Sequence, residues 1–367
     1  MAETKTALYS QPTSLTAAAD QELSVPPFDP AIHLNFQPPS KRYTFSELGL
    51  PVPKGVPDLC YTEPFQLFSD EGIRMIRREV FRRSFLDKYM KSWERAPCII
   101  TGFTKSEEDA PFIKQAMTHP VTQAAVNFAF GAQLQLQNGV NDLGYINVQL
   151  GPEGTDGVYN LNEVPSKPLP PGQKVSASQY DSVPIDGWHH DQAPVVLVLM
   201  LSDTSTMLGG ETAVKISDGR VINAAGAGIG AGVMMAGAYL EHAALRAANC
   251  AERLSLVNSY NYADPDADDS GTTLGSVHHT LDSHDLIRNL FMEQKVQRLR
   301  GRCDAALGRL RERKIKGEDP GREEIEGWIR DQIRLLREMG WEMFERIPEF
   351  VHRKRPEDAV RCYLADA

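Results

Sequence analysis

Cysteine is scarce in this sequence, and its placement excludes two kinds of site. Five cysteines are spread over 367 residues, and no two are separated by only two positions. Neither a disulfide framework nor a zinc ribbon is therefore expected, and a reducing compartment is favoured. The first ten residues also lack the basic-then-apolar order of a secretory signal. A cytoplasmic location is the expectation that follows.

An excess of positive charge is also missing. The chain has 49 acidic and 39 basic residues, a net charge of −10, which argues against a general nucleic-acid binder. Residues 285–355 are locally basic, with 18 Arg and Lys against 14 Asp and Glu. Few aromatic residues accompany them, so the pattern favours two amphipathic helices over a nucleic-acid tail. Their apolar faces are expected to pack on the core or on a partner subunit, and a homodimer through these helices is one such arrangement.

A convincing membrane span is absent as well. The run Val221–Leu240 is uncharged, but six alanines and five glycines make it poor for lipid and poor as a helix. Its glycines do not complete a GxGxxG motif, and no Lys-Ser/Thr pair follows, so a nucleotide-binding loop is not expected. We predict a glycine-rich turn and then a buried strand over 233–236.

Two short stretches carry the chemistry. Trp188-His189-His190-Asp191 provides a His-x-Asp pair, and a distant His242 is followed by Arg253 and Ser255. Two imidazoles and one carboxylate suit Fe(II) and leave coordination positions open. In an extended strand His189 and Asp191 point to the same side, while His190 faces away.

The residues that follow His242 add a candidate anion site. The Arg253 guanidinium is a planar fork that matches a carboxylate, and Ser255 adds a hydroxyl on the same side of a strand. Each of these residues alone has an ordinary structural explanation, such as a turn histidine or an ion pair with Glu252. The order and spacing of the whole set favour the metal site.

Three further polar residues are candidates for the pocket. Asn147 and Gln149 alternate along residues 145–150, which places both amides on one face of a strand. They would either contact the cofactor or form buried hydrogen bonds. Arg246, four residues past His242, is a candidate for binding a substrate carboxylate, with an ordinary ion pair as the alternative.

These stretches resemble a known enzyme family. The similarity extends over about residues 58–265 and is carried best by GWHHDQAPVVLVLMLSDTSTMLGGETAV, GAYLEHAALRA and ERLSLVNSY. They resemble the Fe(II)/2-oxoglutarate-dependent dioxygenases, in particular fungal members that tailor amino acids or other metabolites. The resemblance implies that His189, Asp191 and His242 bind Fe(II), and that Arg253, supported by Ser255, binds 2-oxoglutarate. Halogenating relatives lack the carboxylate, so Asp191 favours a hydroxylase or oxidase type.

The implied activity couples oxidative decarboxylation of 2-oxoglutarate by O₂ to oxidation of a C–H bond in a small molecule. The outcome would be hydroxylation, desaturation or cyclisation of an amino acid or a fungal secondary metabolite. Two alternatives remain open. One is a cupin-like metal enzyme that does not use 2-oxoglutarate, and the other is a non-catalytic partner subunit of the same fold.

The pattern along the chain divides it into four parts. Residues 1–40 are rich in Pro, Ser, Thr and Ala and are expected to form a mobile or surface-draped arm. Residues 41–133 are expected to be mainly helical, with helices that begin at Ser69 and near Ala124. Short strands between turns over 134–265 indicate a mainly β core, with a lid-like insertion at 151–186. Residues 266–367 are expected to form a C-terminal helical region.

The resemblance implies the specific form of that core, a double-stranded β-helix (jelly roll) with N-terminal and C-terminal helical additions. Pattern alone indicates only a sandwich or barrel. The strands are predicted at 145–150, 194–201, 211–217, 233–236 and 253–260.

Overall fold

The computed structural model describes residues 25–92, 96, 98–103, 108–137, 143–150, 184–204, 207–224, 228–248, 250, 252–275, 277 and 282–350. Most of the predicted N-terminal arm and of the lid-like insertion lies outside the described residues. The elements, in chain order, are α1 (Pro30–His33), β1 (Arg42–Tyr43), β2 (Tyr61–Thr62), β3 (Phe65–Gln66), α2 (Asp70–Val80), α3 (Arg83–Tyr89), β4 (Met90–Lys91), β5 (Ile99–Ile100), α4 (Pro111–Thr118), α5 (Pro120–Phe130), β6 (Leu134–Leu136), β7 (Tyr145–Leu150), β8 (Asp186–His189), β9 (Val195–Met200), β10 (Leu208–Gly209), β11 (Thr212–Lys215), β12 (Val221–Ala224), β13 (Ala231–Met235), β14 (His242–Ala244), β15 (Ala247–Ala248), β16 (Glu252–Tyr262), α7 (His284–Lys316), α8 (Arg322–Trp341) and the π-helical segment η4 (Glu342–Phe350).

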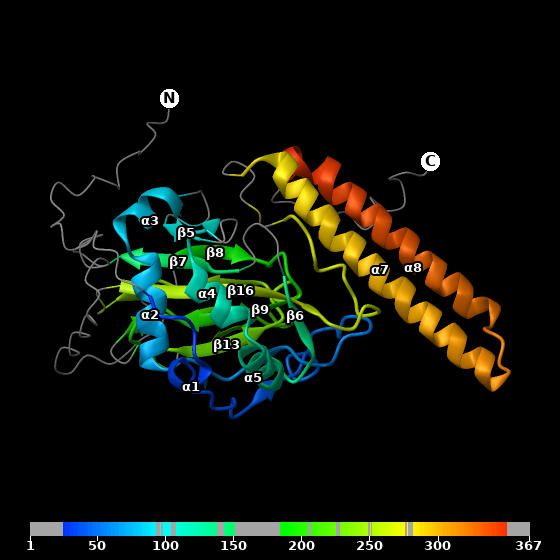
Figure 1. Cartoon of the computed structure of the whole chain (residues 1–367), viewed down its shortest axis with the longest axis horizontal. Coiled ribbons are helices and arrows are strands. Elements are labelled where there is room, and N and C mark those ends of the chain that lie inside the picture. The colour runs from blue at the N-terminus through cyan, green and yellow to red at the C-terminus, as the bar shows by residue number, and fades with distance from the viewer. Residues whose placement is uncertain are drawn as a thin grey trace.

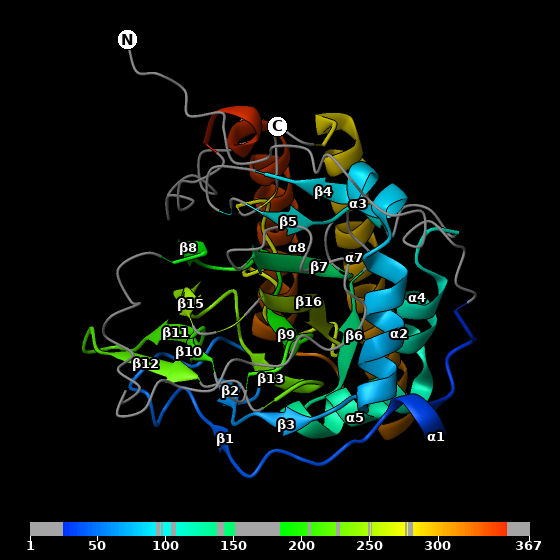
Figure 2. The ribbon, with the colours of Figure 1, turned by 90° about the vertical axis from the view of Figure 1, so that its left-hand side faces the viewer.

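Antiparallel sheets form the body of the molecule, with helices against them (Figures 1 and 2). The larger sheet has the order β1-β2-β13-β9-β16-β7-β5-β4, and β3 and β6 pair at its sides. A second sheet has the order β12-β11-β14-β8, and β10 pairs with β15 separately. The predicted strands all form, with ends that differ from the prediction by up to two residues.

The central strands of the larger sheet are buried on both faces. Successive side chains point to opposite faces, and this alternation decides what each face contacts. On β16, Leu254 and Leu256 belong to the main apolar cluster, which the N-terminal helices α2, α4 and α5 also build. The intervening Arg253, Ser255 and Val257 line a cavity on the other face. A period of two in the sequence therefore separates the structural face from the face that carries polar chemistry.

A smaller apolar cluster fills the space between the two sheets beside that cavity. It includes Val196 of β9, Val214 of β11, and Val233 and Met235 of β13. Residues of both sheets thus share one interior, as expected when two sheets pack face to face.

The N-terminal helices begin where local chemistry allows. Ser69 accepts a hydrogen bond from the Gly72 amide and caps α2, as predicted. Helix α5 begins at Pro120, earlier than predicted, because His119 accepts a hydrogen bond from the Val121 amide and proline is favourable at the first position. Thr44 and Glu47 form the reciprocal bonds of a capping box, but only a turn follows them.

Helices α7 and α8 form a long hairpin beside the sheets, and α7 ends at Gly317 (Figure 1). Helix α7 contacts the body through the buried Ile287 and Phe291 and through basic side chains such as Lys295. Several aliphatic residues of the hairpin are about half exposed, among them Leu307, Leu310, Ile325 and Ile329. The predicted homodimer through these helices stays a prediction. Within the described ranges, no helix has both the length and the apolar character that crossing a bilayer requires.

Candidate metal centre

Two neighbouring strands of the second sheet bring the two histidines together. His189 ends β8, His242 begins β14, and the two residues are direct cross-strand partners. Their ring centroids lie 4.4 Å apart. His189 Nδ1 lies 2.6 Å from the Gly187 carbonyl oxygen, and His242 Nδ1 lies 2.9 Å from that of Leu240. When each Nδ1–H donates to its carbonyl, each Nε2 keeps a lone pair for a metal ion.

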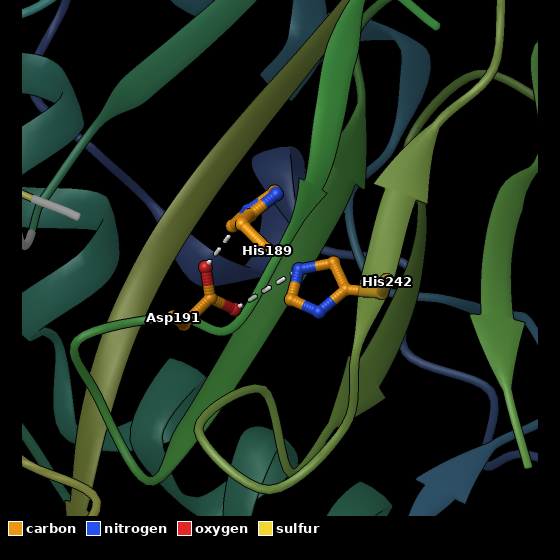
Figure 3. A group of neighbouring side chains, drawn as sticks. All are labelled: His189, Asp191 and His242. Carbon is orange, nitrogen blue, oxygen red and sulfur yellow. Dashed lines mark ion pairs between the residues drawn. The ribbon is translucent and has the colours of Figure 1, made fainter. Parts of the chain in front are cut away.

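Asp191 completes the cluster from just beyond the strand. Strand β8 ends at His189, so Asp191 lies in the following turn and not on the extended strand that the sequence suggested. Its amide donates to the Gly237 carbonyl at 3.0 Å, which fixes the turn against a second turn that leads to His242. The carboxylate then faces both rings, with Oδ1 3.4 Å from His189 Nε2 and Oδ2 3.3 Å from His242 Nε2 (Figure 3).

Charge and burial act against each other at this cluster. Burial alone would raise the pKa of Asp191, but the neighbouring His242 and His189 outweigh it and hold that pKa below its usual value. Burial alone would lower the pKa of His242, but the Asp191 carboxylate outweighs it and raises that pKa. The cluster therefore favours an ionised carboxylate, which is the form that binds a cation.

The donor set fits a divalent transition metal. The ligand atoms of His189, Asp191 and His242 all lie within 4.8 Å of one another. Asp191 Oδ2 is buried and accepts no hydrogen bond from any described residue. A buried carboxylate oxygen without a donor is costly unless a cation binds it. Two imidazoles and one carboxylate are the ligands of non-haem Fe(II) oxygenases.

Gly237 makes room for this carboxylate, and sequence reasoning did not identify it. A Cβ atom at Gly237 would lie 2.0 Å from Asp191 Oδ2 and 2.9 Å from its Cγ. Since these distances are far below van der Waals contact, any side chain here displaces the carboxylate. No sequence pattern signals this contact, because it joins two turns that are distant along the chain.

We therefore expect Gly237→Ala to weaken metal binding by about 10- to 100-fold, the range seen when groups that orient metal ligands are removed. Titration with Co(II), followed by its absorption, measures the effect. Gly308→Ala in α7 is the matched control, since nothing lies within 4 Å of its Cβ position. Equal affinity in Gly237→Ala and the wild type would show that Asp191 is not held where the structure places it.

A cavity of about 70 Å³ continues from the histidines toward Arg253. The Arg253 side chain is almost fully buried, and its Nε donates to the Gly210 carbonyl at 2.8 Å. Its Nη1 donates to Ser255 Oγ at 3.2 Å, so Ser255 lies on the same side of β16, as predicted. Burial lowers the pKa of Arg253 to about 10, while the nearby carboxylates of Glu211 and Asp186 act to raise it. The guanidinium thus stays charged at neutral pH.

Of the other predicted pocket residues, one lines the cavity and two do not. Asn147 lines the cavity and lies opposite Ser255 in the β7–β16 ladder. Gln149 does not line it, because both ends of its amide bond the backbone of Ala247, at 2.6 and 2.7 Å. Arg246 is exposed and also lies outside the cavity. The alternative of a structural hydrogen-bonding role therefore describes Gln149, and neither residue is proposed to bind a ligand.

Several residues of the cavity were missed by sequence reasoning. They are Tyr145, Asp186, Gln192, Val196, Val198, Thr212, Ala244, Val257 and Ser259. Strand alternation could have identified part of this set, since Tyr145 lies two residues before Asn147, and Val257 and Ser259 continue from Ser255. Thr212 comes from another strand, β11, and only the folded sheet places it here.

Comparison with known proteins yields weak structural likenesses only. No model of a protein family matches the sequence, and no curated protein does. Among solved structures, the non-heme alpha ketoglutarate dependent epimerase SnoN from nogalamycin biosynthesis is 14% identical, with a TM-score of 0.35 over 53% of this chain and 75% of the other. A Pseudomonas putida prolyl-4-hydroxylase is 16% identical, with a TM-score of 0.30 over 53% and 88%.

A 2OG-Fe(II) oxygenase family oxidoreductase from Burkholderia pseudomallei is also 16% identical, with a TM-score of 0.27 over 47% of this chain and 65% of the other. All three neighbours are described as alpha-ketoglutarate or 2OG-Fe(II) enzymes or as a prolyl hydroxylase. At TM-scores this low they carry no argument, and the case for function rests on the residues of this chain.

Proposed function

We propose that this protein is an Fe(II)- and 2-oxoglutarate-dependent oxygenase that oxidises a small molecule. The observation that carries the proposal is one cavity that holds both the His189/Asp191/His242 cluster and the buried Arg253 fork. When bound, Fe(II) and a 2-oxo acid would activate O₂ for oxidation of a C–H bond. A metal enzyme that does not use 2-oxoglutarate would need the three ligands but has no need of a buried Arg253.

The strand order supports a double-stranded β-helix as the fold. Eight strands (β7, β8, β9, β11, β12, β13, β14 and β16) divide between the two sheets in the orders β13-β9-β16-β7 and β12-β11-β14-β8. Each sheet is antiparallel, and sequential strands repeatedly cross from one sheet to the other. A double-sheet jelly roll of eight strands has this kind of connectivity. Its interior would hold the metal cluster on one sheet and Arg253 on the other.

The chain's own residues would bind and orient the co-substrate. Nε2 of each histidine and the Asp191 carboxylate would hold the iron on one side, which leaves the opposite side open to the cavity. Arg253, kept in place by Gly210 and Ser255, would bind the far carboxylate of 2-oxoglutarate through charge-assisted hydrogen bonds. The apolar residues of the cavity, such as Val196 and Val257, would exclude water around the reacting groups.

A series of three small acids tests this arrangement. Calorimetry on protein loaded with Co(II) is expected to show binding of 2-oxoglutarate that is at least about tenfold tighter than that of 2-oxobutyrate or glutarate. 2-Oxobutyrate lacks the carboxylate that Arg253 would bind, and glutarate lacks the oxo group that would chelate the metal. Equal binding of all three acids would contradict the proposed orientation, and no binding of any would favour the cupin-like alternative.

For the substrate, only a chemical class is proposed. We propose a small molecule, an amino acid or a secondary metabolite, and its oxidation by hydroxylation, desaturation or cyclisation. A screen of amino acids for 2-oxoglutarate-dependent formation of succinate and of oxidised product tests the class.

A further inference from the structure

One segment of the chain contacts both turns that position the metal ligands. The bridging segment, residues 268–273, lies between the sheets and helix α7. The Thr273 amide donates to the Gln192 carbonyl at 3.2 Å, directly after Asp191. A Cβ atom at Gly271 would lie 2.7 Å from the Cβ atom of Ala238, so the backbone of the segment packs closely on the turn before His242.

A side-chain contact joins the segment to the same turn. The Tyr239 hydroxyl lies 3.3 Å from the Asp268 carboxylate. Burial raises the pKa of Tyr239, which keeps the hydroxyl protonated as a donor. Both turns, 190–193 and 236–240, therefore rest on the bridging segment, and these turns also bond each other through the Asp191 amide and the Gly237 carbonyl.

Helix α7 holds the bridging segment through a buried ion pair. Lys295 Nζ lies 2.6 Å from Asp269 Oδ2 and 3.2 Å from the Asp269 carbonyl oxygen. The two side chains are only 3% and 7% exposed. The other carboxylate oxygen of Asp269 accepts a hydrogen bond from Thr272 at 2.9 Å, inside the same segment. Asp269 thus links the helix to the local fold of the segment.

Removal of one partner of such a pair leaves the other charge buried without compensation. Without Lys295, Asp269 would have to turn toward water, and the turn built on its carboxylate and carbonyl would open. The residues on either side, Asp268 and Thr273, are those that contact the two ligand turns. The disturbance would therefore reach the turns that carry Asp191 and lead to His242.

We infer that Lys295 is a positioning residue for the metal centre, which acts through Asp269 and the bridging segment on the turns around Asp191 and His242. The inference rests on the proposed function only for the identity of the metal. Through the pair of Lys295 and Asp269, the C-terminal hairpin would take part in shaping the site.

The test compares Lys295→Met with the conservative Lys295→Arg and with Arg309→Met. Arg309 pairs with Asp266 from the same helix, but that pair is exposed and precedes the bridging segment. Hydrogen exchange on the metal-free protein reports the turns, in peptides that cover 190–193 and 236–242. Co(II) titration reports the site itself.

Lys295→Met is expected to speed exchange in both turns and to weaken Co(II) binding by about 10- to 100-fold. Lys295→Arg should restore most of the wild-type exchange protection and Co(II) affinity, and Arg309→Met should change neither quantity. Faster exchange confined to α7 and to residues 268–270, with unchanged Co(II) affinity, would overturn the inference and leave Lys295 as an anchor for the helix alone.

Asp269→Asn provides a second route if Lys295→Met does not fold. It keeps the shape of the side chain and removes the charge that Lys295 binds, so the same changes are expected in the same direction. Unchanged turns and unchanged affinity in a folded Asp269→Asn protein would also overturn the inference. The hydrogen-exchange measurement does not depend on the proposed function, because it uses metal-free protein. It can be interpreted even if the wild type binds no Co(II).

Discussion

Asp191→Ala is expected to weaken Fe(II) binding by more than about 100-fold, beyond the range found for groups that only orient a ligand. The carboxylate is the single anionic ligand of the cluster and faces Nε2 of both histidines, at 3.4 and 3.3 Å. Its removal leaves two neutral imidazoles, which hold a divalent ion poorly without a third ligand. Anaerobic titration with Fe(II), followed by equilibrium dialysis, measures the loss.

His190→Ala is the matched control for this variant. His190 lies between the two ligands in the sequence, but its side chain is exposed and does not belong to the ligand cluster. Its replacement should leave Fe(II) affinity within about twofold of the wild type, since surface substitutions away from a site have small effects. If His190→Ala lost binding as fully as Asp191→Ala, the ligand assignment would be wrong.

Arg253→Ala should lose 2-oxoglutarate while it keeps Fe(II). Loss of one partner of a buried, hydrogen-bonded charge pair costs about 2–5 kcal/mol, which is a fall in 2-oxoglutarate affinity of roughly 30-fold or more. His189 and His242 lie on the other sheet and Asp191 in the turn after it, so Fe(II) binding should change little. Calorimetric titration of both ligands into the same preparation separates the two effects.

Arg253→Lys serves as the companion variant. It keeps the positive charge near Asp186 and Glu211, which limits the damage to folding, but it lacks the planar fork. An intermediate affinity for 2-oxoglutarate is expected, with a melting temperature closer to that of the wild type than in Arg253→Ala. Wild-type affinity in both variants would show that the far carboxylate binds elsewhere.

Much of the candidate site could be read from residue type and spacing. Alternation along β16 placed Arg253 and Ser255 on one face, and the structure brings both to the cavity. The position of Asp191 was harder to predict from the sequence, because β8 ends at His189 and the following turn directs the carboxylate toward the two histidines. The space that Gly237 provides could not be predicted, since it depends on a close approach between two turns. Whether the cluster binds iron stays a prediction.

The C-terminal helices show a second limit of prediction from the sequence. Their apolar periodicity was clear, but only part of α7 buries its apolar residues: Ile287 and Phe291 pack in an apolar cluster with Leu274 and Val277, whereas Leu307 and Leu310 remain about half exposed. Basic side chains of the same helix bind the acidic run 264–269: Arg309 pairs with Asp266, and Lys295 pairs with Asp269. These two basic residues of the region are thus neutralised within the chain. The spacing of apolar residues predicts a helix. It does not predict which basic residues of that helix will form ion pairs with an acidic loop that is distant in the sequence.

An anaerobic titration tests whether one cavity holds Fe(II) and 2-oxoglutarate together. Fe(II) is added to metal-free protein, then 2-oxoglutarate, while the visible spectrum is recorded. A weak charge-transfer band, which reports a 2-oxo acid chelating Fe(II), is expected in the wild type and should be absent from Asp191→Ala. Iron binding without the band would contradict the account in favour of a cupin-like enzyme, and folded protein that binds no iron would indicate a non-catalytic subunit.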